Sequence, residues 1–152
     1  MGIVDEILAM AGALGFVAHF PNLPGIFSEL FANALEHGIL NLPTADKYRS
    51  SEGYLDFFEE KRRRLDLLAD GFIAVEMALD SVGGEPALRL IVSDSGSGFK
   101  PGDLPAGVQA DAAGADQRGL RLVSSMALHL SHNELGNEAI VLVGKANACM
   151  KA

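Results

Sequence analysis

Three polar residues, each one helical turn from the next, are the first candidates for chemistry. Glu29, Asn33 and His37 stand at i, i+4 and i+8 in a segment whose apolar spacing predicts a helix over residues 26–40. The helical wheel places this polar stripe beside the buried face, where it would line a cleft. An amide and a carboxylate one turn apart can hold a hydrated Mg²⁺ and position a hydroxyl group. An ordinary exposed helix edge has the same appearance, so this segment alone leaves both interpretations open.

A second candidate is the aspartate at the end of a predicted strand. Asp94 is followed by Gly96 and Gly98, and glycines let a backbone approach a ligand closely and accept positive φ. The Asp94 carboxylate can accept a hydrogen bond from an exocyclic amine such as that of adenine. A plain turn closed by an Asx hydrogen bond is the alternative.

The third candidate is a predicted helix start at Gly119. The free amides of a first helical turn and the positive end of the helix dipole favour phosphate oxygens. Arg118 and Arg121 flank this start and can add charge-assisted contacts, although surface arginines are equally common there. An otherwise acidic chain thus contains a local anion site.

The elements that must position these residues follow from periodicity. Helical spacing marks residues 4–14, 26–40 and 119–130, and alternation marks strands at residues 72–79, 88–92 and 138–143. Gly83 and Gly84 join the first two strands into a β-hairpin. The order indicates an α+β fold, a two-layer sandwich with helices on one face of a mixed sheet.

Two segments interrupt this frame. Residues 41–70 are interpreted as an insertion with an amphipathic helix, in which the run 59–64 faces water and the apolar residues sharing the other side are Leu55, Phe58, Leu65 and Leu68. The basic residues of that run are either a docking patch or a solvated helix face. Residues 99–118 are rich in Gly, Ala, Pro and Asp, and we expect a lid over the site.

Composition limits the class of protein. With 152 residues and 16.0 kDa, residues 1–152 fit a single domain. The formal charge of -8 disfavours nucleic-acid binding and anionic membranes. Cys149 is the single cysteine, the first residues are acidic, and no apolar stretch reaches the roughly 20 residues of a membrane span. We therefore expect a cytoplasmic protein.

Taken in order, the three candidates resemble a known family. The segments that carry the resemblance are Glu29 to Gly38, Asp94 to Phe99 and Arg118 to Val123, which look like the N, G1 and G2 boxes of the GHKL ATPases. The form of the first box, with a glutamate ahead of the asparagine, resembles that of the anti-sigma-factor serine kinases. The insertion and the ending 136–138 resemble the kinase-like domain at the carboxyl end of fused response regulator and phosphatase proteins.

The resemblance implies a role for each matching residue. Glu29 would be the general base, Asn33 the Mg²⁺ ligand and Asp94 the adenine anchor of an ATP site, while His37 is assigned to structure. Gly96 and Gly98 would shape the nucleotide pocket, and the residues contacting phosphates would be Arg118, Gly119 and Leu120.

The implied activity is a serine/threonine kinase that uses Mg-ATP and acts on an anti-anti-sigma-factor partner of the STAS type. The parent chain would carry response regulator and phosphatase domains, and a homodimer is left open. The alternative is a module of the same fold that sequesters a sigma factor or the anti-anti-sigma partner. Two departures from the family favour weaker nucleotide binding: Gln117 replaces a glycine of the last box, and Glu138 or Ala139 replaces a threonine on the last strand.

Overall fold

The computed structural model describes residues 1–42, 51–98 and 118–145, apart from the side chains of Ser51 and Arg118. The helices are α1 (Ile3–Ala13), α2 (Phe16–His19), α3 (Leu23–Asn33), the π-helix η1 (Ala34–Ile39), α4 (Ser51–Leu67) and α5 (Arg118–Met126). The strands are β1 (Ile73–Val82), β2 (Glu85–Asp94), β3 (His129–His132) and β4 (Glu138–Gly144). None of the helices in the described residues is long and apolar enough to cross a membrane.

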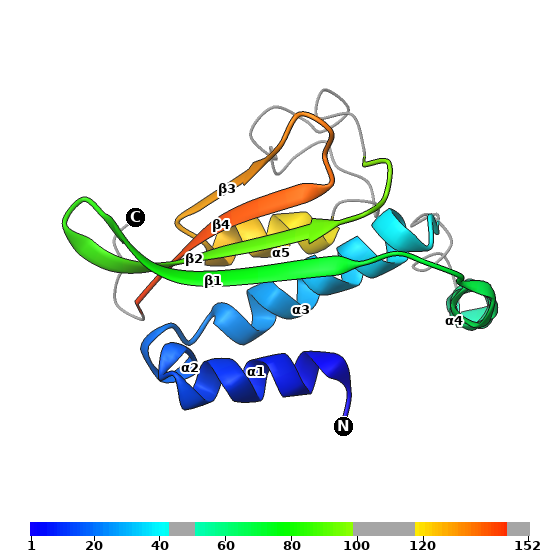
Figure 1. Ribbon diagram of the computed structural model, residues 1–152, viewed down its shortest axis with the longest axis horizontal. Coiled ribbons are helices and arrows are strands. Elements are labelled where there is room, and N and C mark those ends of the chain that lie inside the picture. The colour runs from blue at the N-terminus through cyan, green and yellow to red at the C-terminus, as the bar shows by residue number, and fades with distance from the viewer. Residues whose placement is uncertain (43–50, 99–117, 146–152) are drawn as a thin grey trace.

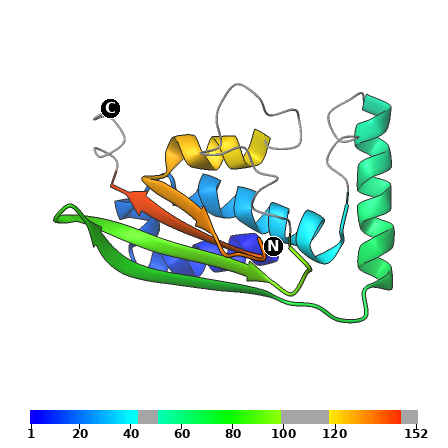
Figure 2. The same cartoon turned by 90° about the horizontal axis from the view of Figure 1, so that it is seen from above.

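The helices α3 and α5 lie on one face of a four-stranded sheet (Figures 1 and 2). The strand order is β1-β2-β4-β3, and all three pairings are antiparallel. The predicted two-layer α+β sandwich is confirmed, but the sheet of the described residues is antiparallel where a mixed one was expected. Short turns explain two of the pairings, because a parallel pair needs a long crossover whereas Gly83 and Gly84, both with positive φ, join β1 to β2 directly and the turn at residues 133–137 joins β3 to β4.

One strand was not predicted. β3 occupies His129–His132, where the sequence analysis extended a helix to residue 130. Its four residues include no β-branched side chain, so the local pattern does not indicate a strand. Pairing with β4 at the sheet edge provides the hydrogen bonds that local propensity does not.

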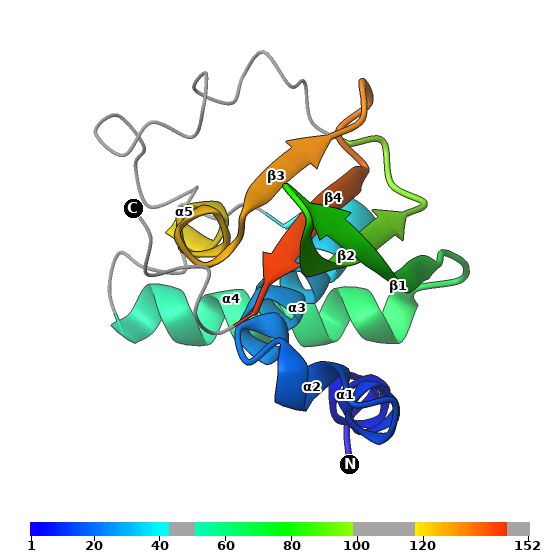
Figure 3. The same ribbon diagram turned by 90° about the vertical axis from the view of Figure 1, so that its left-hand side faces the viewer.

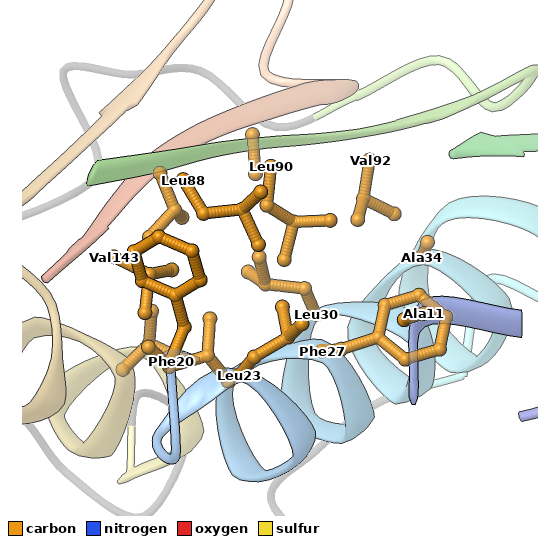
Figure 4. Packing of buried hydrophobic residues seen from close by; sticks show 14 residues of the cluster. Ala11, Phe20, Leu23, Phe27, Leu30, Ala34, Leu88, Leu90, Val92 and Val143 are labelled. Carbon is orange, nitrogen blue, oxygen red and sulfur yellow. The ribbon is translucent and has the colours of Figure 1, made fainter. Parts of the chain in front are cut away.

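The core lies between the sheet and α3 (Figure 4). Leu88 and Leu90 alternate along β2 with both side chains facing the helices, and each is fully buried. Leu23, Phe27 and Leu30 follow the i, i+4, i+7 spacing of α3 and pack against them. The amphipathic helix predicted for residues 26–40 is therefore confirmed as α3 and η1.

The helices α3 and α5 run antiparallel beneath the same face of the sheet (Figure 3). The Asn22 side-chain amide at the start of α3 donates to the Met126 carbonyl at the end of α5 over 3.1 Å. Gly25 leaves room for the Met126 side chain, since a Cβ at Gly25 would stand 3.4 Å from Met126 Cε. This anchor fixes the alignment of the two helices, so the later half of α3 faces the beginning of α5.

The inserted helix α4 stands at one end of the domain (Figure 2). Its orientation contradicts the prediction, because the four residues expected on its inner side are all at least 39% exposed: Leu55, Phe58, Leu65 and Leu68. The buried residue is Phe57, which lies in a cluster with Leu40 and Leu42. The predicted water-facing run is also partly wrong, because Lys61 and Arg64 turn inward.

We predict that Leu90→Ala lowers the free energy of unfolding by about 2–5 kcal/mol, because it removes a fully buried side chain and leaves a cavity. Urea denaturation measures the change. Leu14→Ala is the matched control, since Leu14 is 69% exposed and its loss should have little effect. Equal losses in the two variants would contradict this description of the core.

Candidate functional site

The Asp94 carboxylate lies between two glycine backbones. A Cβ built on Gly38 would stand 2.5 Å from both Asp94 carboxylate oxygens, so only glycine lets η1 approach this closely. A Cβ on Gly96 would collide with the Gly38 carbonyl oxygen. The Gly96 amide donates to Asp94 Oδ1 over 2.8 Å. The first and second motif segments therefore meet at Asp94.

Burial raises the pKa of the Asp94 carboxyl above its ordinary value of 3.8, and the hydrogen bond from the Gly96 amide opposes that rise. Desolvation disfavours the charged form, and one backbone donor compensates for it only in part. The hydrogen bond from the Gly96 amide closes the Asx turn that was the alternative interpretation of this segment.

The third segment meets the first at Glu29 and Asn33. A Cβ on Gly119 would stand 2.6 Å from Glu29 Oε2 and 3.8 Å from Asn33 Nδ2. Both side chains are half-buried. The first turn of α5, with its free amides, therefore lies directly beside the carboxylate and amide of α3.

These two meeting points lie along one continuous helix. Gly38 is five residues beyond Asn33, a little more than one helical turn. The part of the helix between them is the π-helix η1, which closes with the Leu40 amide donating to the Leu35 carbonyl at 2.9 Å. Single turns of π-helix occur frequently at functional sites, because the wider turn changes which side chains face a neighbour.

His37 connects η1 to the chain beyond it. Its Nδ1 lies 2.7 Å from the Leu42 carbonyl oxygen, and because a carbonyl only accepts, Nδ1 must carry the proton and donate. This contact supports the structural role assigned to His37.

The turn between β3 and β4 supports the Asp94 loop from the other side. Asn133 Oδ1 accepts from three successive amides, those of Gly136, Asn137 and Glu138, at 2.8, 3.1 and 3.3 Å. The Asn137 side chain donates to the Gly96 carbonyl at 3.3 Å, and the Asp94 amide donates to the Asn137 carbonyl at 2.8 Å. Gly98, with φ of 75°, leaves no room for a Cβ beside the Leu135 carbonyl. This turn therefore sets the path of the glycine loop.

The insertion holds the end of η1 through charges. Lys61 Nζ on α4 lies 2.9 Å from Glu36 Oε1, and the Glu36 side chain is 5% exposed. Arg64 Nη1 donates to the carbonyls of Leu40 and Asn41, both at 2.8 Å. Those carbonyls follow a helix end, where unpaired acceptors and the negative end of the dipole favour a cation. This explains why α4 turns basic residues inward.

The outcome for the predicted site residues is therefore mixed. The structure brings Glu29 and Asn33 beside Gly119, and Asp94 beside Gly96, while Leu120 packs against the core. The Arg118 side chain, Gln117 and the predicted lid at residues 99–117 lie outside the described residues. The residues that the sequence analysis missed as site supports are Gly38, Glu36, Lys61, Arg64, Asn133 and Asn137. Only the Asn and Gly residues of 133–137 gave a local signal, that of a turn.

Among the described residues, no group of three or more His, Cys, Asp or Glu side chains is arranged to hold a metal ion. A Mg²⁺ ion that takes one protein amide, several waters and substrate phosphates needs no such group. Asn33, which lies beside the α5 start, is the described residue that best suits this kind of ligation.

Comparison with known proteins gave no match to a family model, to a curated protein or to a solved structure.

We predict that Asp94→Asn makes the protein more stable at pH 7. The pKa of Asp94 is higher in the folded protein than its ordinary value of 3.8. Its protonated form therefore adds to the stability of the fold in full below pH 3.8, and this contribution is lost as the pH rises through the folded-state pKa. An amide avoids this loss and can still accept from the Gly96 amide. Chemical denaturation should show a higher unfolding free energy for Asp94→Asn than for wild type at pH 7, and a smaller difference at pH 4. Asp56→Asn, at an exposed position, is the control and should show little difference at either pH. A variant less stable than wild type at pH 7 would contradict the burial of this charge.

Lys61→Met should cost about 1–3 kcal/mol of unfolding free energy, because it removes an ion pair at 2.9 Å from the nearly buried Glu36 carboxylate. Arg63→Met is the matched control, since the Arg63 side chain is 58% exposed and pairs only with Glu60 on its own helix in the described residues. Thermal denaturation of both variants measures the difference. Equal stability of Lys61→Met and its control would contradict the proposed stabilising role of the Lys61–Glu36 ion pair.

Proposed function

We propose that this chain is an ATP-binding serine/threonine kinase domain of the GHKL type that phosphorylates an anti-anti-sigma-factor partner of the STAS type. The single observation that supports it most is the convergence of three distant segments, with Gly119 beside Glu29 and Asn33, and Gly38 and Gly96 beside Asp94. The resemblance predicts that these three segments meet, and their contacts support the proposal for that reason.

The chemistry of the residues fits a nucleotide. One oxygen of Asp94 is held by the Gly96 amide, which orients the carboxylate as an acceptor for the exocyclic amine of adenine. At the other end, the first amides of α5 suit phosphate oxygens, and Asn33 would hold Mg²⁺. In this proposal the adenine end would lie beside η1 and the phosphate end beside the start of α5.

The proposed chemical step uses Glu29. When bound, Mg-ATP supplies the phosphoryl group and the neutralising cation, and catalysis rests mainly on positioning. Glu29 Oε2, which lies beside the α5 start, would take the proton from the attacking serine or threonine hydroxyl. A positioned base of this kind contributes roughly 10²- to 10⁴-fold in rate.

The cell biology of the proposal follows from its family. The domain would act in the cytoplasm, within a parent chain that carries response regulator and phosphatase domains, and its partner would present one phosphorylatable residue. The charge of -8 suits a protein substrate better than a nucleic acid.

A second candidate function is a binding module that sequesters a sigma factor or the anti-anti-sigma factor without phosphate transfer. One contact favours it. Ala139 shares the core-facing side of β4 with Val141, whereas Glu138 accepts from the Ser93 hydroxyl at 3.1 Å on the other face. Neither Glu138 nor Ala139, the two positions that correspond to the family's threonine, carries a hydroxyl. The water-mediated contact to adenine would then be missing, which favours weaker adenine binding.

Nucleotide binding is tested first. Mg-ATP should raise the thermal midpoint, since a ligand at 100 times its Kd stabilises the native state by about 2.7 kcal/mol. Asp94→Asn should abolish the rise and Glu29→Gln should retain it, with Glu6→Gln on α1 as an exposed control. No rise at millimolar Mg-ATP would remove the nucleotide from this proposal.

Phosphate transfer separates the two candidate functions. With labelled ATP and STAS-type partner proteins, wild type and Glu6→Gln should label a serine or threonine, and Glu29→Gln should be slower by roughly 10²- to 10⁴-fold. Binding of partner and nucleotide without any labelling would favour the sequestering module. Equal rates for wild type and Glu29→Gln would deprive Glu29 of its role as base.

A further inference from the structure

The backbone turns back sharply where η1 ends. Asn41 has a positive φ of 51°, and in the described parts of the chain it is the only residue other than glycine to do so. Asparagine accepts this left-handed conformation more readily than most residues, but the conformation still costs energy. The Leu42 amide donates to the Glu36 carbonyl at 2.7 Å, so the reversed chain closes onto η1. The turn also directs two carbonyls to a single point, since those of Leu40 and Asn41 both accept from Arg64 Nη1 at 2.8 Å.

The turn of η1 that lies against Asp94 is also the turn that α4 holds. Glu36 pairs with Lys61 of α4 at 2.9 Å. Gly38, two residues later, meets the Asp94 carboxyl. Arg64, one helical turn beyond Lys61, binds the carbonyls that follow this turn. Because all of these contacts involve one short stretch of backbone, the position of α4 constrains how closely η1 approaches Asp94.

The segment after α4 reaches the other partner of this contact. Gly71 has a φ of 136°, and a Cβ there would stand 3.4 Å from both Ile39 Cγ2 of η1 and Ser95 Oγ. The Phe72 amide donates to Ser95 Oγ at 2.9 Å, and the Ser95 amide donates to the Phe72 carbonyl at 3.0 Å. The insertion is thus attached on both sides, to η1 at one end and to the loop after β2 at the other.

The contact between Gly38 and Asp94 needs such support. Partial burial raises the pKa of the Asp94 carboxyl, so this packing disfavours the charged form that is present at neutral pH. An unsupported η1 would gain by moving away and letting water reach the carboxylate. The ion pair of Lys61 and the hydrogen bonds of Arg64 oppose that movement.

We propose that Lys61 and Arg64 are positioning residues of the candidate site, which hold the η1 backbone against Asp94 and so set the affinity for the adenine end of the nucleotide. They act through Gly38 and not through contact with the ligand. A misplacement of about 1 Å in such a site can cost roughly 10²-fold. The ligand rests on the proposed function, whereas the support that α4 gives to the Asp94 contact can be measured without nucleotide.

The pKa of Asp94 tests this support in the nucleotide-free protein, by NMR titration of the side-chain carboxyl carbons. In Arg64→Met and in Lys61→Met it should fall toward its ordinary value of 3.8, because η1 moves away and water reaches the carboxylate. Loss of a nearby cation alone would raise it, so the direction of change separates positioning from a direct charge effect. Arg63→Met is the matched control, since the Arg63 side chain is 58% exposed on the same helix, and it should leave the pKa unchanged.

Nucleotide affinity tests the consequence. In calorimetry, Lys61→Met and Arg64→Met should each bind Mg-ATP about tenfold or more weakly than wild type, while Arg63→Met binds like wild type. Lys61→Arg keeps the ion pair and should restore the affinity. The rate of phosphate transfer at saturating Mg-ATP should stay within about twofold of wild type in every variant, because the interaction lost is one of binding and not of the transition state.

The outcomes separate this inference from the proposed function. In variants that circular dichroism shows to be folded, an Asp94 pKa that stays at the wild-type value or rises would overturn the support by α4. A lowered pKa with an unchanged dissociation constant would overturn its effect on the nucleotide. A wild-type chain that binds no Mg-ATP would remove the proposed function and this ligand together, and the pKa measurement would still decide whether α4 positions η1.

Discussion

The close approach of two glycine backbones to the partly buried carboxylate of Asp94 is the contact on which the rest of the arrangement depends. Any side chain at Gly38 would meet the Asp94 carboxyl, and any at Gly96 would meet the Gly38 carbonyl. Because η1 can lie this close to the end of β2, the helix α3 is aligned with the sheet, and its Glu29 and Asn33 reach the start of α5. Partial burial raises the pKa of the Asp94 carboxyl, so the charged form at this position costs stability at neutral pH.

Supports around Asp94 come from both sides of the sheet end. The turn of Asn133 and Asn137 holds the glycine loop, while Lys61 and Arg64 of α4 hold the end of η1. Ser95 adds a further link to the insertion, since the Phe72 amide donates to its hydroxyl at 2.9 Å. α4 is therefore joined directly to the end of η1, while the segment that follows it is joined to the Asp94 loop.

Local patterns in the sequence predicted the parts of this fold that local physics determines. The amphipathic α3, the hairpin about Gly83 and Gly84, and the last strand each have a clear period or turn signal. The candidate residues Glu29, Asn33, Asp94 and Gly119 were chosen by type and spacing; the structure brings Gly119 beside Glu29 and Asn33, and places Asp94 beside Gly38 of the same helical segment. Features fixed by tertiary contact were not predictable in this way. Gly38 of the π-helix η1 packs against Asp94, α4 turns Lys61 toward Glu36, and β3 is held by its pairing with β4.

The central claim is that three segments of the chain form one nucleotide site, and amide NMR during a Mg-ATP titration tests it most directly. The amides of Gly38, Gly96 and Gly119 report on the three segments separately. We expect all three to shift along a single saturation curve with one common dissociation constant. No shifts at millimolar Mg-ATP, or shifts confined to one segment, would contradict the claim.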